Sequence, residues 1–325
     1  MDIRDIKTYL AGPLQEVAVV TEDALRSDIG LLDATNRSLL SRGGKQLRPM
    51  LSLLCAGAAG GINRDSVRFA AASELLHNAT LLHDDVVDGA QERRGNPTVM
   101  SLLGGQASVL LGDFWLVRAV KCILDAEQDG TRVIRLFAKT LSDLAEGELL
   151  QMEKASTADT SREDYLRIIY AKTASLFETA ALSGALSAGA PGEWTDALGT
   201  YARELGLAFQ VRDDMFDYAG GMEVGKPVGI DLQEQKITLP LLCALDGVSL
   251  EEAAGVREKV RRISDCPELA GEVRNFVLSH DGVGSAQRQM QEMIDKAIFS
   301  VRILPDSAEK SYLVKLARYV GERTY

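Results

Sequence analysis

Two clusters of aspartates share one spacing and lie far apart in the chain. Each follows the pattern D-D-x-x-D at the end of an apolar helical run: Asp84, Asp85 and Asp88 in the first cluster, and Asp213, Asp214 and Asp217 in the second. Positions i, i+3 and i+4 share a helix face, so we expect the three carboxylates of each cluster to converge. Like charges at this spacing repel, and a bound cation relieves the repulsion. Mg²⁺ is typically held by one or two carboxylates, water and substrate phosphates, so the clusters predict a Mg²⁺ site.

The alternative interpretation of one such cluster is a solvated acidic helix end. Two copies, each embedded in apolar residues, disfavour it. Cations also occupy the segments around the clusters, some of them beside glycines that let backbone approach a ligand: Lys45, Arg48, Arg93, Arg94, Lys172, Lys226 and Lys236. Taken alone, Gly-Gly-Lys is usually a plain turn, and the arginine pair could either offset the aspartates or clamp a phosphate. Together with six carboxylates, the cations predict a polyphosphate site with several Mg²⁺ ions.

Other catalytic patterns are missing from the sequence. The chain has three histidines and no zinc-binding pattern, no Gly-x-Ser-x-Gly and no Walker A sequence, which leaves hydrolase and nucleotide-kinase functions with little support. His77 lies seven residues before Asp84, on roughly the same face, although a single histidine there is more often a core residue. Gln210 lies three residues before Asp213 and shares its face.

Composition limits the class of protein. The chain has 325 residues, 46% hydrophobic and 26% charged, as in ordinary globular proteins, and its net charge of −11 disfavours nucleic-acid binding. The four cysteines are widely spaced, which favours reduced thiols and a cytoplasmic location over disulfides or zinc. We expect no signal peptide and no integral membrane segment, because no uncharged apolar run is long enough.

Apolar periodicity predicts helices nearly throughout, at 31–40, 51–59, 65–88, 107–126, 131–153, 161–189 and 194–218, with shorter ones over 237–319. Asp65 and Ser161 are the predicted N-caps, and 91–98 and 219–235 are predicted loops. Period-2 alternation is absent, so we expect little or no sheet. We therefore predict one all-α domain over residues 1–325, a helical bundle with the two acidic helix ends facing across a central cavity.

The sequence motifs, taken in their order along the chain, resemble those of the all-trans polyprenyl diphosphate synthases. The resemblance covers about residues 30 to 245 and shows no departure at a catalytic position. It is carried by Gly43-Gly44-Lys45, Leu47-Arg48-Pro49, His77, the first acidic cluster, Arg93-Arg94-Gly95, Gly112-Asp113, Gly147-Glu148, Lys172-Thr173, Phe209-Gln210, the second acidic cluster, Gly225-Lys226, Asp231-Leu232, Lys236 and Thr238-Leu239-Pro240. Each motif is weak alone, whereas the ordered set is specific.

The resemblance implies an isoprenoid-synthase type of helical bundle and a role for each motif. All six aspartates would bind the Mg²⁺ that bridges the diphosphate of an allylic prenyl primer. That diphosphate would also be held by Arg93, Lys172, Thr173, Gln210, Lys226 and Lys236. Isopentenyl diphosphate would be held by Lys45, Arg48, His77 and Arg94. A homodimer is also implied, with the apolar run 109–124 as a candidate interface, although core packing explains that run equally well.

The residues before Asp84 bear on product length. The growing chain is expected to run back along this helix, where Ala79 and Thr80 are small and Leu76 is a candidate for the tunnel floor. In the family, bulky aromatics at this place give short products, so we expect a long-chain product, with a farnesyl or geranylgeranyl diphosphate synthase as the alternative. Plain helix packing also explains one small alanine. A terpene cyclase, a non-catalytic partner subunit and a helical phosphohydrolase are competing functions; the second diphosphate site and the six retained carboxylates argue against the first two.

Overall fold

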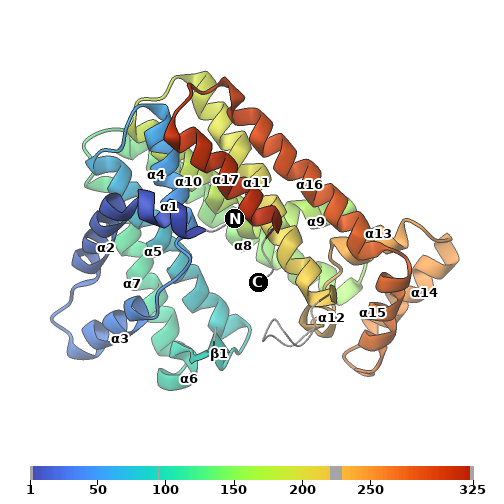
Figure 1. Ribbon diagram of the computed structural model, residues 1–325. Helices are drawn as coiled ribbons and strands as arrows, with labels where there is room; N and C mark the ends of the chain where they lie inside the picture. Colours follow the sequence, from blue (N-terminus) through green and yellow to red (C-terminus); the bar gives the residue numbers. More distant parts are fainter. Residues whose placement is uncertain (1–2, 94, 220–228, 323–325) are drawn as a thin grey trace.

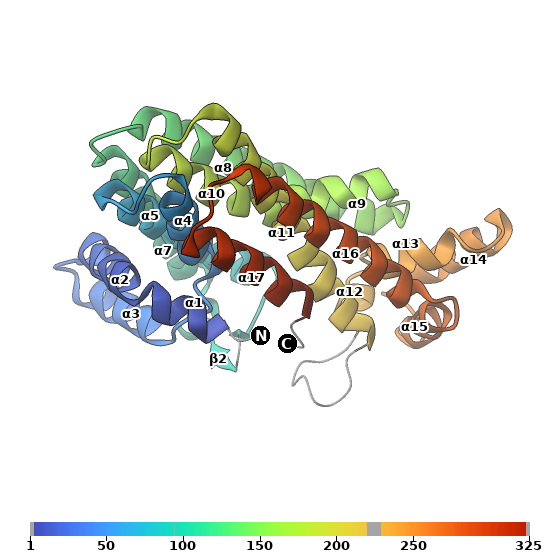
Figure 2. The ribbon, with the colours of Figure 1, turned by 45° about the horizontal axis from the view of Figure 1, so that its top comes forward.

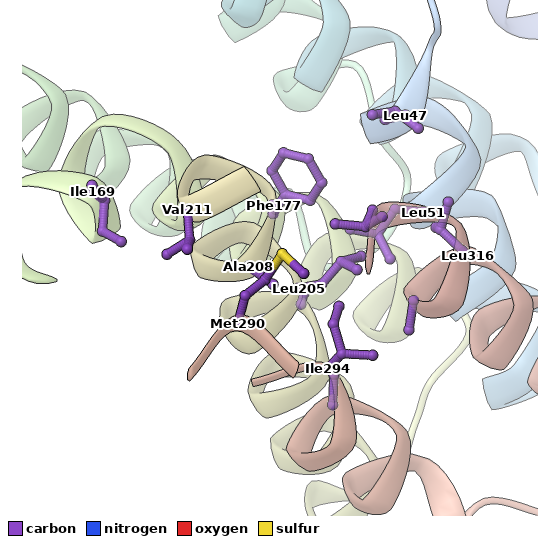
Figure 3. Packing of buried hydrophobic residues seen from close by; sticks show 14 of the residues in the cluster. Leu47, Leu51, Ile169, Phe177, Leu205, Ala208, Val211, Met290, Ile294 and Leu316 are labelled. Atoms are coloured by element: carbon purple, nitrogen blue, oxygen red, sulfur yellow. The ribbon is translucent and has the colours of Figure 1, made fainter. Parts of the chain in front are cut away.

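Helix α11 (Gly192–Ala219) runs through the middle of the molecule and ends in the second acidic cluster (Figure 1). The computed structural model describes residues 3–93, 95–219 and 229–322. Leu205, Ala208 and Val211 on α11 are fully buried. Figure 3 shows them packed among Met290 of α16 (Gly282–Ser300) and Phe177 of α10 (Ser175–Ser187), with side chains of α4 (Leu47–Ala59) close by. This apolar core holds the acid-bearing end of α11 in a rigid frame.

Helix α5 (Arg64–Val87) carries the first acidic cluster at its C-terminal end. The predicted N-cap was wrong: Asn63, not Asp65, caps the helix by accepting the backbone N–H groups of Asp65 and Ser66. Asp65 is inside the first turn, where its carboxylate accepts the backbone N–H groups of Glu127 and Gln128 at 3.0–3.1 Å. Asp65 lies two residues after the N-cap. Its carboxylate is stabilised there by the helix dipole and by these hydrogen bonds to a distant loop.

Helix α7 (Gly105–Leu124) packs along α5 and builds a second apolar cluster with it. Leu76 and Ala79 of α5 and Trp115 of α7 are buried in this cluster. The imidazole of His83 on α5 packs against Gly112 of α7, where an added Cβ would lie 2.3 Å from its Nε2. The hydroxyl of Ser108 also donates to the carbonyl of Leu82 at 2.8 Å. These contacts set the position of the last turns of α5.

The helix predicted over 161–189 is not an α-helix throughout, because a π-helical stretch interrupts its hydrogen-bonding pattern. Ser161 is its N-cap, as predicted, and forms a capping box with Asp164. The chain then forms α9 (Arg162–Ile169), a short π-helix η1 (Tyr170–Ala174) and α10. Single-turn π-helices inside α-helices are frequent at functional sites. Here the π-helix contains Lys172 and Thr173, two of the residues expected to bind diphosphate.

Two glycines on neighbouring helices allow the close packing of η1. An added Cβ at Gly147 of α8 (Gly130–Thr157) would lie 2.5 Å from the Cβ of Ala171, and one at Gly206 of α11 would lie 2.5 Å from the Cα of Ala174. Both distances are far below van der Waals contact, so neither position accepts a side chain without movement of the backbone. The π-helix is therefore held between α8 and α11.

Gly206→Ala is expected to lower the free energy of unfolding by about 2 kcal/mol, because the new methyl group overlaps backbone that cannot yield cheaply. The matched control is Gly255→Ala, a helical glycine of α14 (Leu250–Arg261) with no atom within 4 Å of an added Cβ. That change is expected to raise stability by about 0.5–1 kcal/mol through helix propensity. Urea unfolding followed by circular dichroism measures both, and equal effects would contradict the packing argument.

The all-α class predicted from the sequence is confirmed. The remaining elements are α1 (Ile3–Tyr9), α2 (Ala11–Leu25), α3 (Gly30–Ser41), β1 (Glu92–Arg93), β2 (Asn96–Pro97), α6 (Val99–Leu103), α12 (Ile230–Gln233), α13 (Leu239–Leu245), α15 (Leu269–Ser279), the 3₁₀ turn η3 (Val301–Ile303) and α17 (Ala308–Glu322). Strands β1 and β2 form an antiparallel pair inside the predicted loop 91–98. Helix α12 likewise lies inside the predicted loop 219–235, and α4 begins four residues before the predicted start.

Figure 2 shows α14 and α15 side by side at one end of the molecule, with the helices α1 to α3 at the other. Between these ends, α5, α10, α11 and α16 make up the body of the bundle. Within the described ranges, none of the helices is both long and apolar enough to cross a membrane.

Candidate active site

The first acidic cluster divides its carboxylates between different surroundings. Asp85 is buried and accepts a hydrogen bond from Nε of Arg93 at 2.7 Å. Asp84 is half-buried, and Asp88, the C-cap of α5, is exposed. Arg93 lies on β1, so the short strand pair returns this cation to the helix end. Positions 84 and 88 share a helix face, while position 85 is turned about 100° away from 84.

The second cluster is divided in the same way. Asp214 is 4% exposed, and its two oxygens accept hydrogen bonds from the hydroxyl of Tyr165 at 2.6 Å and from Nε2 of Gln210 at 2.8 Å. Asp217 accepts the backbone N–H groups at the start of α12, from residues 229, 230 and 231, at 3.0–3.1 Å. These three hydrogen bonds fix the first turn of α12. Asp213 is half-buried.

The expected convergence of three carboxylates in each cluster does not occur. Among the residues that the structure describes, no group of three or more His, Cys, Asp or Glu side chains is gathered closely enough to hold a metal ion. The reason is the pitch of the helix: i and i+4 share a face, but the intervening neighbour points elsewhere and finds a protein partner. Asp84 and Asp88 share a face in the first cluster, and Asp213 is half-buried in the second. Mg²⁺ commonly takes one or two carboxylates together with water and phosphate oxygens.

Lys172 connects the π-helix to the first cluster. Its Nζ lies 2.6 Å from Oε2 of Glu148 on α8. Burial raises the pKa of Asp84 to about 6; Lys172 opposes this shift, while Glu148 and Asp88 add to it. Arg93 also opposes the shift. Asp84 thus lies half-buried beside two further carboxylates, Glu148 and Asp88, and such a group of carboxylates favours a bound divalent cation. Their all-oxygen donor set suits a hard ion such as Mg²⁺.

Lys236 connects the second cluster to the first. It forms an ion pair with Glu234, and although burial lowers its pKa, the net shift is upward because Glu234, Asp231 and Asp88 favour the charged form. Burial also raises the pKa of Asp231, and the neighbouring Asp217 raises it further. Lys236 therefore lies among carboxylates that include Asp88 of the first cluster and Asp231, which itself neighbours Asp217 of the second.

A pocket opens beside these residues, between α8, η1, α11 and α12. Its lining includes Tyr165, Lys172, Gln210, Asp214, Asp231 and Lys236. Beside the pocket, the hydroxyl of Thr173 donates to Oε1 of the lining residue Gln210 at 2.7 Å, so the predicted Thr173 and Gln210 are in contact. A pocket with several cations beside paired carboxylates can bind a polyphosphate together with divalent metal ions.

The other predicted cations lie at the N-terminal end of α4. Lys45 and Arg48 are both half-buried, and the guanidinium of Arg48 lies 4.9 Å from the ring centre of Phe177. Nη1 of Arg42 donates to the carbonyl of Pro97 on β2 at 2.7 Å, which ties the loop before α4 to the strand pair that carries Arg93. His77 is half-buried on α5. Arg94 and Lys226, also predicted, lie outside the described residues.

The residues expected to control product length are on the α7 side of α5. Leu76 and Ala79 are fully buried, and Thr80 is half-buried with its hydroxyl donating to the carbonyl of His77. They belong to or border the apolar cluster that includes Trp115. Their role in setting product length stays a prediction.

Three residues, two that line the pocket and one that pairs with Lys172, carried no role in the sequence analysis. Glu148 and Asp231 were part of recognised motifs without an assigned role, and Tyr165 was not singled out. One signal for Tyr165 was available, since it precedes Lys172 by seven residues and the two share a helix face. Glu148 offered none, because its contact with Lys172 joins different helices.

Comparison with known proteins shows the family to which the chain belongs. The sequence profile described as Polyprenyl synthetase matches residues 30–276. An octaprenyl diphosphate synthase from Haemophilus influenzae is 36% identical over 326 residues, covering 100% of this chain and 98% of the relative. The chain belongs to the polyprenyl synthetase family. It is therefore a trans-prenyltransferase, as the resemblance predicted.

Solved structures of the polyprenyl synthetase family have the same fold. A decaprenyl diphosphate synthase from Rhodobacter capsulatus superimposes with a TM-score of 0.92 at 33% identity, with all of both chains covered. A polyprenyl synthase from Caulobacter crescentus, in complex with calcium and isoprenyl diphosphate, gives a TM-score of 0.91 at 34% identity and covers 100% of this chain and 98% of that one.

Proposed function

We propose that this polyprenyl synthetase family member condenses isopentenyl diphosphate with an allylic prenyl diphosphate, in the presence of Mg²⁺, to make a long-chain all-trans polyprenyl diphosphate. The observation that carries the proposal is the pocket in which Lys172, Lys236 and Gln210 lie beside the carboxylates of two helix ends. Octaprenyl diphosphate synthases from two organisms share 36% identity with nearly the whole chain.

The allylic diphosphate is assigned to this pocket. Its negative charge would pair with Lys172, Lys236 and Arg93, and Gln210 and Thr173 would hydrogen-bond it. The exchange of Glu148 for diphosphate at Lys172 is possible because their ion pair is partly exposed. Asp84, Asp88 and Asp213 are the best placed to hold Mg²⁺, which would supply charge stabilisation to the departing diphosphate. The calcium and isoprenyl diphosphate complex of the Caulobacter relative supports a site of this chemistry.

Isopentenyl diphosphate is assigned to the cations before α4. Lys45 and Arg48, with His77 and Arg94, would hold its diphosphate and direct its double bond towards the allylic carbon. As the allylic C–O bond breaks, the double bond attacks the cation, and a proton then leaves for the departing diphosphate. Lys172 and Lys236 would stabilise the charge that accumulates on that leaving group. The apolar α5–α7 wall would shield the cation from water.

A long-chain product is favoured by the small residues Ala79 and Thr80 and by the long-chain relatives. A short-chain synthase is the second candidate, because a geranylgeranyl diphosphate synthase from Methanosarcina mazei is 34% identical over 89% of this chain.

The test of the proposed function is incubation with Mg²⁺, labelled isopentenyl diphosphate and primers of several lengths, followed by chromatography of the products. Long labelled chains are expected. Products no longer than geranylgeranyl diphosphate would support the short-chain candidate. Turnover of a prenyl diphosphate alone would indicate a cyclase, and phosphate release without chain growth would indicate a phosphohydrolase.

The two diphosphate sites predict opposite kinetic effects of two substitutions. Arg48→Ala is expected to raise the KM for isopentenyl diphosphate about tenfold, and Lys236→Ala is expected to do the same for the allylic primer, because each removes one charged hydrogen-bond donor from one site. Steady-state kinetics with each substrate varied in turn measures both values. Equal effects of both substitutions on both substrates would rule out this division of the cations.

We propose further that the chain forms a homodimer through α7. Leu110, Val117 and Leu124 are spaced seven residues apart, so they form one stripe, and each is more than 60% exposed. An apolar stripe of this kind marks an interaction surface, and the symmetric contact of two copies covers it. Light scattering is expected to give twice the chain mass, and a monomer would refute the dimer.

We also propose that residues 1–325 form a single unit. A cytoplasmic location is a further proposal, and the four free thiols are consistent with it.

A further inference from the structure

Tyr165 of α9 has a hydroxyl group that ends in the active-site pocket although the rest of its side chain belongs to the core. The residue is 2% exposed, and its ring is part of the main apolar cluster. Its hydroxyl donates to Oδ2 of Asp214 at 2.6 Å, and both residues line the pocket. Burial and the nearby Asp214 hold the pKa of Tyr165 well above its usual range, so the hydroxyl keeps its proton and acts as a donor.

The hydrogen bonds continue from Asp214 to the diphosphate-binding residues. Nε2 of Gln210 donates to the other oxygen of Asp214 at 2.8 Å, which turns Oε1 of Gln210 towards Thr173. The hydroxyl of Thr173 then donates to Oε1 at 2.7 Å. Asp214 is the acceptor for both Tyr165 and Gln210, and the orientation of Gln210 in turn sets the acceptor for Thr173. The orientation of Gln210 and Thr173 is therefore determined by a residue that is itself almost completely buried.

Removal of the Tyr165 hydroxyl would leave Oδ2 of Asp214 without its donor in a buried position. Such an oxygen is costly to bury, and the carboxylate regains a partner by rotation. Rotation of the Asp214 carboxylate would break the hydrogen bond from Gln210. The side-chain amide of Gln210, and then the hydroxyl of Thr173, would lose their fixed orientation. The effect is transmitted along contacts rather than by any contact of Tyr165 with substrate.

We propose that Tyr165 is a positioning residue for the allylic diphosphate: it holds Asp214, which orients Gln210 and Thr173 towards the ligand. This inference rests on the proposed function, because it assigns a role within the same site. It places Asp214 among the residues that support the ligand-binding groups. Tyr165 reaches the pocket from α9, whereas Lys45 and Arg48, assigned to isopentenyl diphosphate, lie at the start of α4, so only one of the two substrates should be affected.

The test is Tyr165→Phe, which removes one oxygen and keeps the ring in the core. Isothermal titration calorimetry with Mg²⁺ and farnesyl diphosphate, without isopentenyl diphosphate, is expected to show a dissociation constant about tenfold higher than that of the wild type. The KM for isopentenyl diphosphate is expected to stay within about twofold of the wild-type value. In a double-mutant cycle, Thr173→Val should weaken binding less in the Tyr165→Phe background than alone, because the two residues act through one chain.

Tyr201→Phe is the matched control. Tyr201 is also fully buried, and its hydroxyl donates to the carbonyl of Leu313 at 2.7 Å, outside the pocket. It should lower the Tm by a similar amount but leave farnesyl diphosphate binding unchanged. Equal binding by Tyr165→Phe and wild type, equal weakening by both phenylalanine variants, or loss of the fold in Tyr165→Phe alone would overturn the proposal in favour of a core role. Wild-type protein that neither binds farnesyl diphosphate nor extends it would instead refute the proposed function.

Discussion

Asp84→Ala and Asp213→Ala are each expected to lower turnover at least about 100- to 1,000-fold, because each removes a carboxylate that we propose holds the charge-stabilising metal at the leaving group. The fold should survive Asp84→Ala for a physical reason. The pKa of Asp84 in the folded protein is raised to about 6 from 3.8, mainly by burial. A raised carboxyl pKa means that stability present below pH 3.8 is lost as the pH rises through about 6. At pH 7.5 the metal-free variant should therefore be at least as stable as the wild type.

The measurements are kcat with saturating substrates and Mg²⁺, and Tm without metal. Asp125→Ala is the control, since Asp125 is an exposed carboxylate at the end of α7, away from the pocket. It should leave kcat unchanged. A stable Asp84→Ala protein with near-normal turnover would remove the first cluster from the mechanism, and the same result for Asp213→Ala would remove the second. If Asp84→Ala is more stable than the wild type but inactive, Asp84 is retained for function at a cost in stability.

Ala79→Tyr is expected to shorten the longest product to farnesyl or geranylgeranyl diphosphate without abolishing isopentenyl incorporation. Ala79 is 1% exposed, one turn and a half before Asp84 on α5. A helical turn spans about 5.4 Å, close to the reach of one isoprene unit, so a bulky ring here would stop the chain after few additions. Overpacking is expected to cost about 1–3 kcal/mol of stability in the absence of substrate, so Tm is measured with product length.

Ala72→Tyr is the matched variant for this experiment. Ala72 is buried in the same cluster seven residues earlier, about 10 Å further from Asp84 along the helix. Its longest product should exceed that of Ala79→Tyr by about two isoprene units. An unchanged product distribution in folded Ala79→Tyr would show that the chain does not pass this position. The long-chain interpretation would then lose its main structural support.

The sequence alone determined the helical class, the approximate ends of the long central helices and the family. Helical periodicity is a local signal, since residues that share a face are three or four positions apart, and it predicted α5, α7 and α11 to within a few residues. The capping box at Ser161 is equally local. The two D-D-x-x-D clusters and the ordered motifs around them were sufficient to predict the enzyme class, because the chemistry requires those residue types at the ends of two helices.

Only the tertiary structure decided how the clusters are used. Asp85, Asp214 and Asp217 find partners at Arg93, Tyr165 and the start of α12, and no periodicity predicts these contacts. The ion pair between Glu148 and Lys172 joins α8 to the π-helix, and the two approach closely at Gly147. On α11, Gly206 allows an equally close approach to the π-helix. Such contacts join residues separated by many positions. They depend on how closely the helices pack, which is set by the shapes of the surrounding side chains rather than by any local pattern in the sequence.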